Sequence, residues 1–353
     1  MRILAIETSC DETAIAVVDA KGGLKRPRFK IVANEVASQI KIHRPFGGVV
    51  PNLAKREHIK NLPILFKRIL KAKGLKLKAD IIAVTVGPGL EPALWTGINF
   101  AKELAKKYKK PLIGVNHMEG HLYSNWFLPV REIQNSKFKI QTSIKTIVFP
   151  AIVLVVSGGH TILLKMDSVT KRKKLGETRD DAAGEAYDKV ARLLDLPYPG
   201  GPEIEKIAKR GNSEAVQFPR PMLNQKNYDL SFSGLKTAVL YYLRDNPLKA
   251  KSLKLKADIA ASFQQAAIDV LVAKTMNAAK EYKAKSVMLC GGVAANKALR
   301  KELKIQSLKF KADFYAPEFA LNTDNAAMIA AAGYVSFLKK KKLRLTAQSN
   351  LSL

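Results

Sequence analysis

Acidic residues are scarce in this chain of 353 residues, which has 30 Asp and Glu against 60 Lys and Arg and a formal net charge of +30. This imbalance favours a polyanionic partner such as nucleic acid, although an acidic protein partner or particular growth conditions would also produce it. The excess is mostly lysine, in runs at 102–110, 249–256 and 339–342. Each run alone is first of all typical of a solvated helix face or loop. The total excess of positive charge therefore carries more weight than any one run.

Cysteine and long apolar segments are also scarce. Cys10 and Cys290 are the only two cysteines. They offer neither a disulfide framework nor metal-ligand spacing, as expected in a reducing cytoplasm, and we interpret both as packing residues at strand ends. The longest apolar run, 147–156, is too short to cross a bilayer and contains Pro150. No cleavable signal precedes the first strand, so the sequence predicts a soluble, cytoplasmic protein without membrane segments.

Hydrophobic residues make up 47% of the chain, enough for a substantial core in two domains or lobes. Two strand-turn-strand units lie about half a chain apart, at 3–18 and 151–165. They predict an internally duplicated α/β fold with one nucleotide-binding hairpin per lobe. The pattern resembles the actin-like ATPase (ASKHA) architecture of sugar kinases and Hsp70, in which nucleotide and metal would lie in the cleft between the lobes.

The segments around these hairpins alternate between strand and helix patterns. Expected helices are 51–73, 93–108, 181–194, 203–210 and 259–282, and further expected strands are 81–86 and 286–290. We expect one lobe at 1–115, completed by a C-terminal helix at about 325–353, and a second lobe at 116–324. Within the second lobe, 131–147 is the best candidate for an exposed insertion, and the residues after Leu343 have the composition of a tail.

Histidine is scarce as well, with five in the chain. His117 and His121 are four residues apart, so a helix would stack both imidazoles on one face, where they can share a metal. They directly follow an apolar strand-like run, where α/β proteins place active-site residues, and we read them together with Asp324. Met118 stands where the protease motif His-Glu-x-x-His has its general base, and Glu119 lies on another face. Zinc-dependent peptide hydrolysis by the usual route is therefore disfavoured.

Glycine-containing turns supply candidate phosphate and nucleotide sites. Ser157-Gly158-Gly159, between two strands, lets backbone amides approach a ligand, and this position favours phosphate over a plain hairpin turn. The segment 291–296 joins a strand to a helix, where Asn296 could bond a base, although a simple turn is an open alternative. Asp188 and Glu205 flank another glycine loop, as carboxylates that bind ribose hydroxyls do, but ordinary helix-surface acids are commoner.

Taken together, these motifs resemble the universal tRNA adenosine threonylcarbamoyltransferase family in its bacterial branch, called TsaD. Each segment alone is weak, whereas the combination is specific and nearly spans the chain. The matching segments are 6–13, 47–51, 117–121, 157–161, 180–186, 198–202, 218–221, 231–236, 291–296 and 323–325.

The resemblance implies a set of site residues and a reaction. The implied ligands of a divalent iron or zinc ion are His117, His121 and Asp324. The phosphate side of an adenylate would contact Val155, Val156, Ser157, Gly158 and Gly159. The ribose would contact Asp188, Gly201 and Glu205, and the adenine would contact Asn296. Family members transfer a threonylcarbamoyl group from threonylcarbamoyl-adenylate to the exocyclic amine of adenosine 37, in tRNAs that read codons beginning with A, and release AMP. Their partners are tRNA and the TsaB and TsaE subunits.

The chemistry is coherent, because three protein ligands leave open positions on a metal and an adenylate supplies a good leaving group. The attacking amine is a poor base, so positioning by bound tRNA matters more than a strong base. Glu12 and Glu119 are our candidates for proton handling. Val155 and His160 stand where archaeal and eukaryotic members carry Tyr and Asn, which places the chain on the bacterial side.

Two further classes stay open. An actin-like ATPase or kinase would hold magnesium with oxygen ligands, and the histidine pair argues against it. A non-catalytic scaffold paralogue would have no need of both histidines and Asp324, so their presence favours the enzyme.

Overall fold

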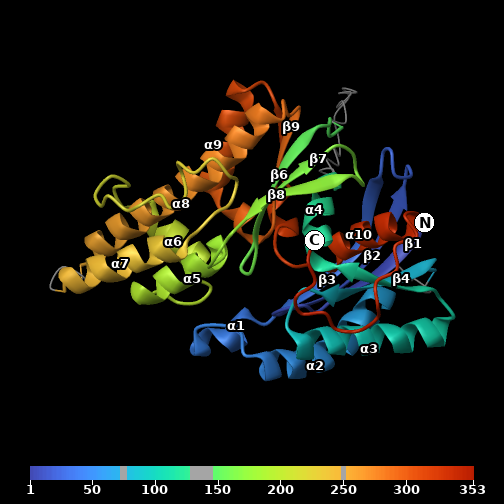
Figure 1. The fold of residues 1–353 in the computed structure, drawn as a ribbon. Helices are drawn as coiled ribbons and strands as arrows, with labels where there is room; N and C mark the ends of the chain where they lie inside the picture. The colour runs from blue at the N-terminus through green and yellow to red at the C-terminus, as the bar shows by residue number, and fades with distance from the viewer. Residues whose placement is uncertain (72–77, 128–145, 248–251) are drawn as a thin grey trace, which may run out of the picture.

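The computed structural model describes residues 1–71, 78–127, 146–247 and 252–353, which form two five-stranded mixed sheets with helices around and between them (Figure 1). The first sheet contains β1 (Arg2–Glu7), β2 (Glu12–Lys21), β3 (Arg28–Ser38), β4 (Ile81–Gly87) and β5 (Leu112–Asn116). The second contains β6 (Ala151–Val156), β7 (Thr161–Met166), β8 (Arg172–Glu177), β9 (Ser286–Cys290) and β10 (Asp313–Tyr315).

The two sheets share one topology. Their strand orders are β3-β2-β1-β4-β5 and β8-β7-β6-β9-β10. In each sheet the first three strands pair antiparallel and the last two join by parallel pairing. The duplication expected from the two strand-turn-strand units is therefore confirmed, and each unit extends into a third, outer strand that the sequence pattern did not predict.

The helices occupy three layers. Their bounds are α1 Ile40–His43, α2 Pro51–Lys71, α3 Glu91–Tyr108, α4 His117–Tyr123, α5 Ala183–Leu193, α6 Gly200–Ala208, α7 Ser233–Asp245, α8 Leu253–Glu281, α9 Lys297–Lys309 and α10 Ala326–Leu338. Helices α2 and α3 share a core with the outer face of the first sheet, and α5–α9 share another with the outer face of the second. A third core lies between the sheets and contains α4 and α10 (Figure 1).

Helix α10 connects the end of the chain to the middle of the molecule. Its sequence, rich in alanine, is buried on every side from Ala326 to Ser336, because neighbours cover the whole helix surface. The small side chains allow close approach: a Cβ on Gly333 would lie 2.8 Å from the Ala83 Cβ of β4, and one on Gly120 of α4 would lie 2.9 Å from Ile329 Cδ1. Helices α4 and α10 are thus held against each other at nearly minimal separation.

The prediction that the residues after Leu343 form a tail is wrong. Leu343, Leu345 and Leu351 pack against the outer core of the first sheet, and the Gln348 amide donates to the Val86 carbonyl at 2.8 Å. The segment lacks helical periodicity, but its partly buried leucines pack on the sheet and hold it there. The C-terminal helix accordingly ends at Leu338 instead of continuing toward residue 353.

Two other expectations concern the outside of the fold. Except for residues 146 and 147, the expected insertion 131–147 lies outside the described residues. Over the described ranges, no helix combines the length and apolar character that a membrane span requires. Cys290 ends β9 and is buried as expected, whereas Cys10 lies in the turn after β1 and not at a strand end.

Candidate metal and nucleotide site

Helix α4 begins at His117, directly after β5, and presents the histidine pair. The Asn116 side chain caps it by accepting hydrogen bonds from the amides of Met118 at 2.8 Å and Glu119 at 3.2 Å. The imidazoles of His117 and His121 meet edge to face, with ring centroids 4.7 Å apart. The helical spacing of the pair therefore produces the shared face that the sequence predicted.

Asp324, just before α10, completes a group of three. Its Oδ1 lies 3.3 Å from His117 Nε2 and 3.1 Å from His121 Nε2, and the three candidate ligand atoms all lie within 4.8 Å of one another. Both imidazoles are almost fully buried. Neither ring nitrogen of His121 makes a hydrogen bond to the described residues. An orphaned, buried imidazole nitrogen beside a carboxylate fits a divalent metal, and two imidazoles with one carboxylate suit zinc or iron and leave positions open.

Glu7, at the end of β1, orients His117 from behind. Its Oε2 lies 3.1 Å from His117 Nδ1 and accepts a hydrogen bond from Thr85 Oγ1 at 2.6 Å. The carboxylate is fully buried. Burial raises the pKa of Glu7, but the His117 imidazole outweighs this and holds the pKa below its usual value. A carboxylate hydrogen-bonded to Nδ1 fixes the tautomer of the His117 ring and directs its Nε2 toward His121 and Asp324. The same arrangement is found behind metal-bound histidines.

The charges within the group of three are mutually dependent. Burial lowers the pKa of His117, but Asp324 and Glu7 outweigh it and raise the pKa well above the usual value. Burial also raises the pKa of Asp324, and the two imidazoles outweigh this, so that the Asp324 pKa lies below its usual range. A positive charge between the two Nε2 atoms and Asp324 Oδ1 would satisfy the Asp324 carboxylate.

His117 and Asp324 line one wall of a cleft of about 370 Å³ between the sheets, and His121 is buried beside them. The other walls come from the turns after β1, β4, β6 and β9, the start of α1, and the segments at the starts of α6 and α10. Their residues are Ser9, Cys10, Asp11, Glu12, Ile40, Pro88, Gly89, Leu90, Ser157, Gly158, Gly159, His160, Tyr198, Pro199, Pro202, Gly292 and Thr323. The cleft thus opens at the carboxyl ends of the central strands β1 and β6, where α/β folds bind ligands.

The two candidates for proton handling are placed differently. Glu12 lines the cleft, and burial, followed by Asp11 and Asp324, raises its pKa well above the usual value. Glu119 points elsewhere: its carboxylate pairs with Arg172 and with Lys341 Nζ at 2.9 Å. It does not line the cleft, because its position on α4 faces away from the two histidines. Glu119 therefore acts as a partner for two cations, and the sequence had no signal for that pairing.

A second hollow, of about 170 Å³, adjoins the cleft and shares Gly158, Pro199, Pro202 and Gly292 with it. It contains the predicted ribose and adenine residues Asp188, Gly201, Glu205 and Asn296, together with Gly184, Tyr187, Val293 and Ala295. The structure therefore brings together side chains that are far apart in the sequence, in a space beside His117 and Asp324.

Several polar groups of this second hollow are already engaged. Asp188 Oδ1 accepts from the Gly200 amide at 2.7 Å, and burial raises the Asp188 pKa. Asn296 caps α9 by accepting from the Leu299 amide at 2.9 Å and donates to Gln264 Oε1 at 2.8 Å. Glu205 Oε1 accepts from the Lys297 amide at 3.3 Å. These bonds preorganise the walls of the hollow.

The turn after β6 has room for a ligand, but the strand before it does not. The Ser157 amide donates to the His160 carbonyl at 2.8 Å, and an added Cβ on Gly158 or Gly159 would meet nothing within 4 Å. Val155 and Val156 are 0% exposed and pack into the cores on opposite faces of the second sheet. The predicted contact of these two valines with the phosphate is therefore not brought about by their side chains, because strand alternation buries both.

Two hydrogen bonds cross from the first half of the chain to the second beside the cleft. Arg44 Nε donates to the Tyr198 carbonyl at 2.9 Å, and an Arg192 guanidinium nitrogen donates to the Gly47 carbonyl at 2.6 Å. Glu7, Gly47 and Tyr198 lie in the matching segments, but sequence reasoning assigned them no role and did not single out Arg44 or Arg192. The role of these residues depends on which segments face each other and not on local spacing.

The fold and the site define an actin-like α/β protein in which two imidazoles and a carboxylate lie beside a glycine-walled hollow. Solved structures show the fold: full-length HypF in its phosphate- and nucleotide-bound form has a TM-score of 0.55 at 13% identity, covering 98% of this chain and 47% of that one. HypF from T. kodakarensis has a TM-score of 0.58 at 15% identity, covering 96% and 48%. At such identities the likeness concerns the fold alone.

The chain belongs to the TsaD family, whose description is tRNA N6-adenosine threonylcarbamoyltransferase and whose model matches residues 30–331. A protein of that name from Thermosipho melanesiensis is 49% identical over 100% of both chains. The Bacillus subtilis protein of the same name is 47% identical over 96% of this chain and 91% of its own length.

We predict that Glu7→Gln weakens zinc binding about 10- to 100-fold, because it replaces the carboxylate that orients His117. Metal affinity is measured by competition with a chromogenic chelator, on protein whose fold is checked by circular dichroism.

The matched control is Glu119→Gln, which removes a buried carboxylate from α4 on the side facing Arg172 and Lys341. It should leave zinc affinity within about twofold of wild type. Equal losses in both variants would contradict the orienting role of Glu7.

Proposed function

We propose that this chain transfers a threonylcarbamoyl group from threonylcarbamoyl-adenylate to the exocyclic amine of adenosine 37, in tRNAs that read ANN codons, and releases AMP. The observation that carries the proposal is the group formed by His117, His121 and Asp324, beside a cleft that Glu12 also lines and that continues into a glycine-walled hollow. The 49% identity to a threonylcarbamoyltransferase over the full length supports the same reaction.

The three ligand residues would hold one divalent ion, Fe²⁺ or Zn²⁺. When bound, such an ion supplies Lewis acidity toward carbonyl or phosphate oxygens of the substrate. The chain itself contributes the preset geometry: Glu7 fixes the His117 ring, and the close contact of α4 with α10 fixes Asp324 relative to both imidazoles. The protein thus maintains the site without reorganising it during the reaction.

The adenylate would occupy the second hollow with its phosphate toward the cleft. The open backbone at Gly158 and Gly159 suits the phosphate, and Asp188 and Glu205 offer carboxylate oxygens to the ribose hydroxyls. Asn296 stands at the adenine end, where its amide is held by α9 and Gln264. This orientation places the acyl group in the cleft, beside the point that His117 and Asp324 face.

Glu12 is the residue we assign to the proton. The attacking aromatic amine loses a proton as the new C–N bond forms and the bond to the phosphate oxygen breaks. Glu12 lines the cleft, and burial raises its pKa, which makes its carboxylate a stronger base for that proton. Because the amine is a poor base, most of the rate enhancement would come from holding the nucleotide base and the adenylate together.

The wider setting of the enzyme follows from the same proposal. We infer a cytoplasmic location and TsaB-like and TsaE-like protein partners, as the family resemblance implies. We also propose the lobe boundaries 1–115 with 325–353, and 116–324, since α10 packs on strands of the first sheet.

The direct test is nucleoside mass spectrometry of unmodified tRNA after incubation with threonylcarbamoyl-adenylate, this protein and its partner subunits. Wild type should form threonylcarbamoyladenosine, and His117→Ala should reduce both product and bound metal to background, because one of three ligands is lost. His43→Ala is the matched control: His43 is also buried but bonds Gln39 outside the cleft.

Equal product from wild type and His117→Ala would reject the ligand role. If wild type forms no product although its partners are bound, the ATPase and scaffold alternatives gain support over the transferase.

For Glu12→Gln we predict a kcat lower by about 10²- to 10⁴-fold, since the amide cannot accept the proton. Metal content should match that of wild type, because Glu12 is not one of the three ligands. Retention of full kcat in a metal-loaded, folded variant would remove Glu12 from the mechanism.

A further inference from the structure

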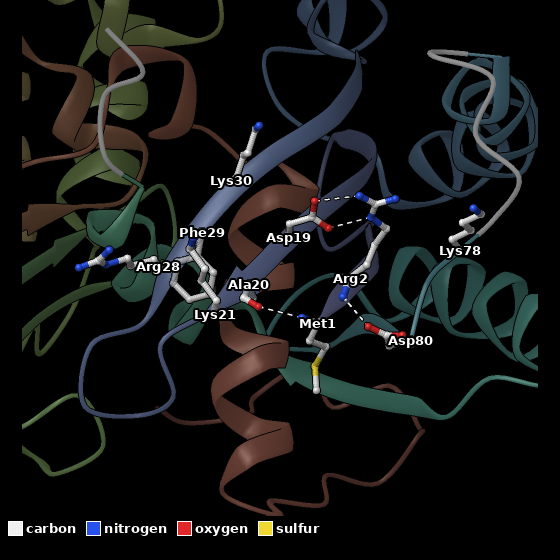
Figure 2. A pocket seen from close by; sticks show the side chains of 10 residues that line it. All are labelled: Met1, Arg2, Asp19, Ala20, Lys21, Arg28, Phe29, Lys30, Lys78 and Asp80. Carbon is white, nitrogen blue, oxygen red and sulfur yellow. Dashed lines mark hydrogen bonds and ion pairs between the residues drawn. The ribbon is translucent and has the colours of Figure 1, made fainter. Parts of the chain in front are cut away.

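The first sheet has a basic hollow at the end remote from the cleft. It has a volume of about 590 Å³ and lies where β1 and β3 begin and β2 ends, beside the residues that precede β4 (Figure 2). We call it the hairpin hollow; its lining residues are Met1, Arg2, Asp19, Ala20, Lys21, Arg28, Phe29, Lys30, Lys78 and Asp80. None of them lines the cleft or the second hollow.

The two acids of the hairpin hollow are already satisfied by one arginine. Arg2 binds Asp19 through two nitrogens, at 2.7 and 2.8 Å, and the Arg2 amide donates to Asp80 Oδ2 at 2.7 Å. The hydrogen bond from Arg2 is the largest influence on Asp19 and holds the pKa of that carboxyl below its usual range. The Arg2 guanidinium therefore offsets the charge of Asp19, which leaves Asp80 as the single further acid among the lining residues against Lys21, Arg28, Lys30 and Lys78.

Four further cations surround this pair. Lys21, Arg28, Lys30 and Lys78 are all exposed, and within the described part of the chain none of their charged groups forms an ion pair with a carboxylate. The connection between β2 and β3 reinforces the charge, since residues 21–30 contain five Lys and Arg and no Asp or Glu. An excess of one sign maintained over one end of a sheet attracts a polyanion.

The arrangement of the cations indicates what kind of anion fits. Figure 2 shows the charged ends of Arg28, Lys30 and Lys78 apart from one another, spread around Arg2 and Asp19. A compact anion such as free phosphate needs donors that converge on one point. Separated lysines and arginines instead match a chain of phosphates, in which successive charges are spaced along a backbone.

We propose that the hairpin hollow binds the phosphate backbone of the tRNA substrate while the target adenosine occupies the cleft. The proposal rests on the proposed function for the identity of the RNA. Strand β2 links the two places, with Glu12 of the cleft at one end and Lys21 of the hollow at the other. Its ten residues span about 30 Å at about 3.3 Å per residue, a distance that a folded RNA bridges readily.

The position of the hollow gives it a role distinct from that of the cleft. Phosphate contacts fix the register and orientation of a nucleic acid without reading its sequence. An anchor at the far end of β2 would align the RNA along the first sheet, so that the reactive base enters beside Glu12 and the two histidines. Loss of the anchor should weaken binding while leaving the chemistry of bound RNA intact.

The test neutralises three cations in the full-length chain by combining Lys21→Gln, Lys30→Gln and Lys78→Gln. Binding of fluorescent unmodified tRNA is followed by anisotropy over a range of NaCl concentrations. Each lost phosphate contact lowers the magnitude of the slope of log K against log[salt] by about 0.7 to 0.9. We expect a total decrease of about 2 to 3 and roughly 10- to 100-fold weaker binding near 0.1 M salt.

The matched control removes the same charge from the other half of the molecule by combining Lys301→Gln, Lys304→Gln and Lys309→Gln, three exposed lysines of α9. It should leave the slope near the wild-type value. Equal decreases in both triple variants would show a dependence on net charge alone and overturn the proposal. An unchanged slope in the first variant would overturn it as well, as would loss of binding to an acidic partner protein without loss of tRNA binding.

Product formation separates this proposal from the proposed function. With tRNA at saturation, the first triple variant should keep kcat near that of wild type while KM for tRNA rises. If wild type makes no threonylcarbamoyladenosine but the slope still falls only in the first variant, the transferase assignment fails and the RNA-binding surface stands.

Discussion

The contact between α4 and α10 is the constraint on which the site depends. Two ligand candidates, His117 and His121, lie on α4, and the third, Asp324, precedes α10, some 200 positions along the chain. The glycine at position 120 lets Ile329 and Met328 approach α4, and the Gly333 backbone lies close to Ala83 of the first sheet. Because both helices pack into the core between the two sheets, the imidazoles and the Asp324 carboxylate are held together.

Electrostatics within the cleft contrast with those of the surface. The chain has only 30 acidic residues, yet Asp11, Glu12 and Asp324 line the cleft and Glu7 lies directly behind His117. Buried carboxylates are costly unless they are paired or coordinate a metal. The cleft is therefore suited to a cation, while the lysine-rich exterior, including the hairpin hollow, is suited to the polyanion that carries the substrate base. The region suited to a cation and the region suited to a polyanion thus lie in different parts of the molecule.

The sequence revealed the parts of the site that depend on local spacing. The histidine pair, the glycine turn after β6 and the two strand-turn-strand units follow from helix and strand periodicity, which neighbours reinforce. The sequence did not reveal the outer strands, because edge strands lack the two-sided burial that marks a strand. Strand β8 reads Arg-Lys-Lys-Leu-Gly-Glu, and β3 is only partly buried. Helix α10 is buried all round, so it has no polar face to indicate its orientation. Glu7, Glu119 and the packed segment after Leu343 depend on tertiary neighbours that no local pattern encodes.

The most direct test of the central account is anomalous diffraction at the zinc or iron edge, from crystals of the full chain loaded with that metal. The account predicts one strong peak about 2.0–2.2 Å from the Nε2 atoms of His117 and His121 and from an Asp324 carboxylate oxygen. A structure with no peak at that point, or with its metal bound instead by Asp11 and Glu12, would contradict the claim that α4 and α10 build the metal centre.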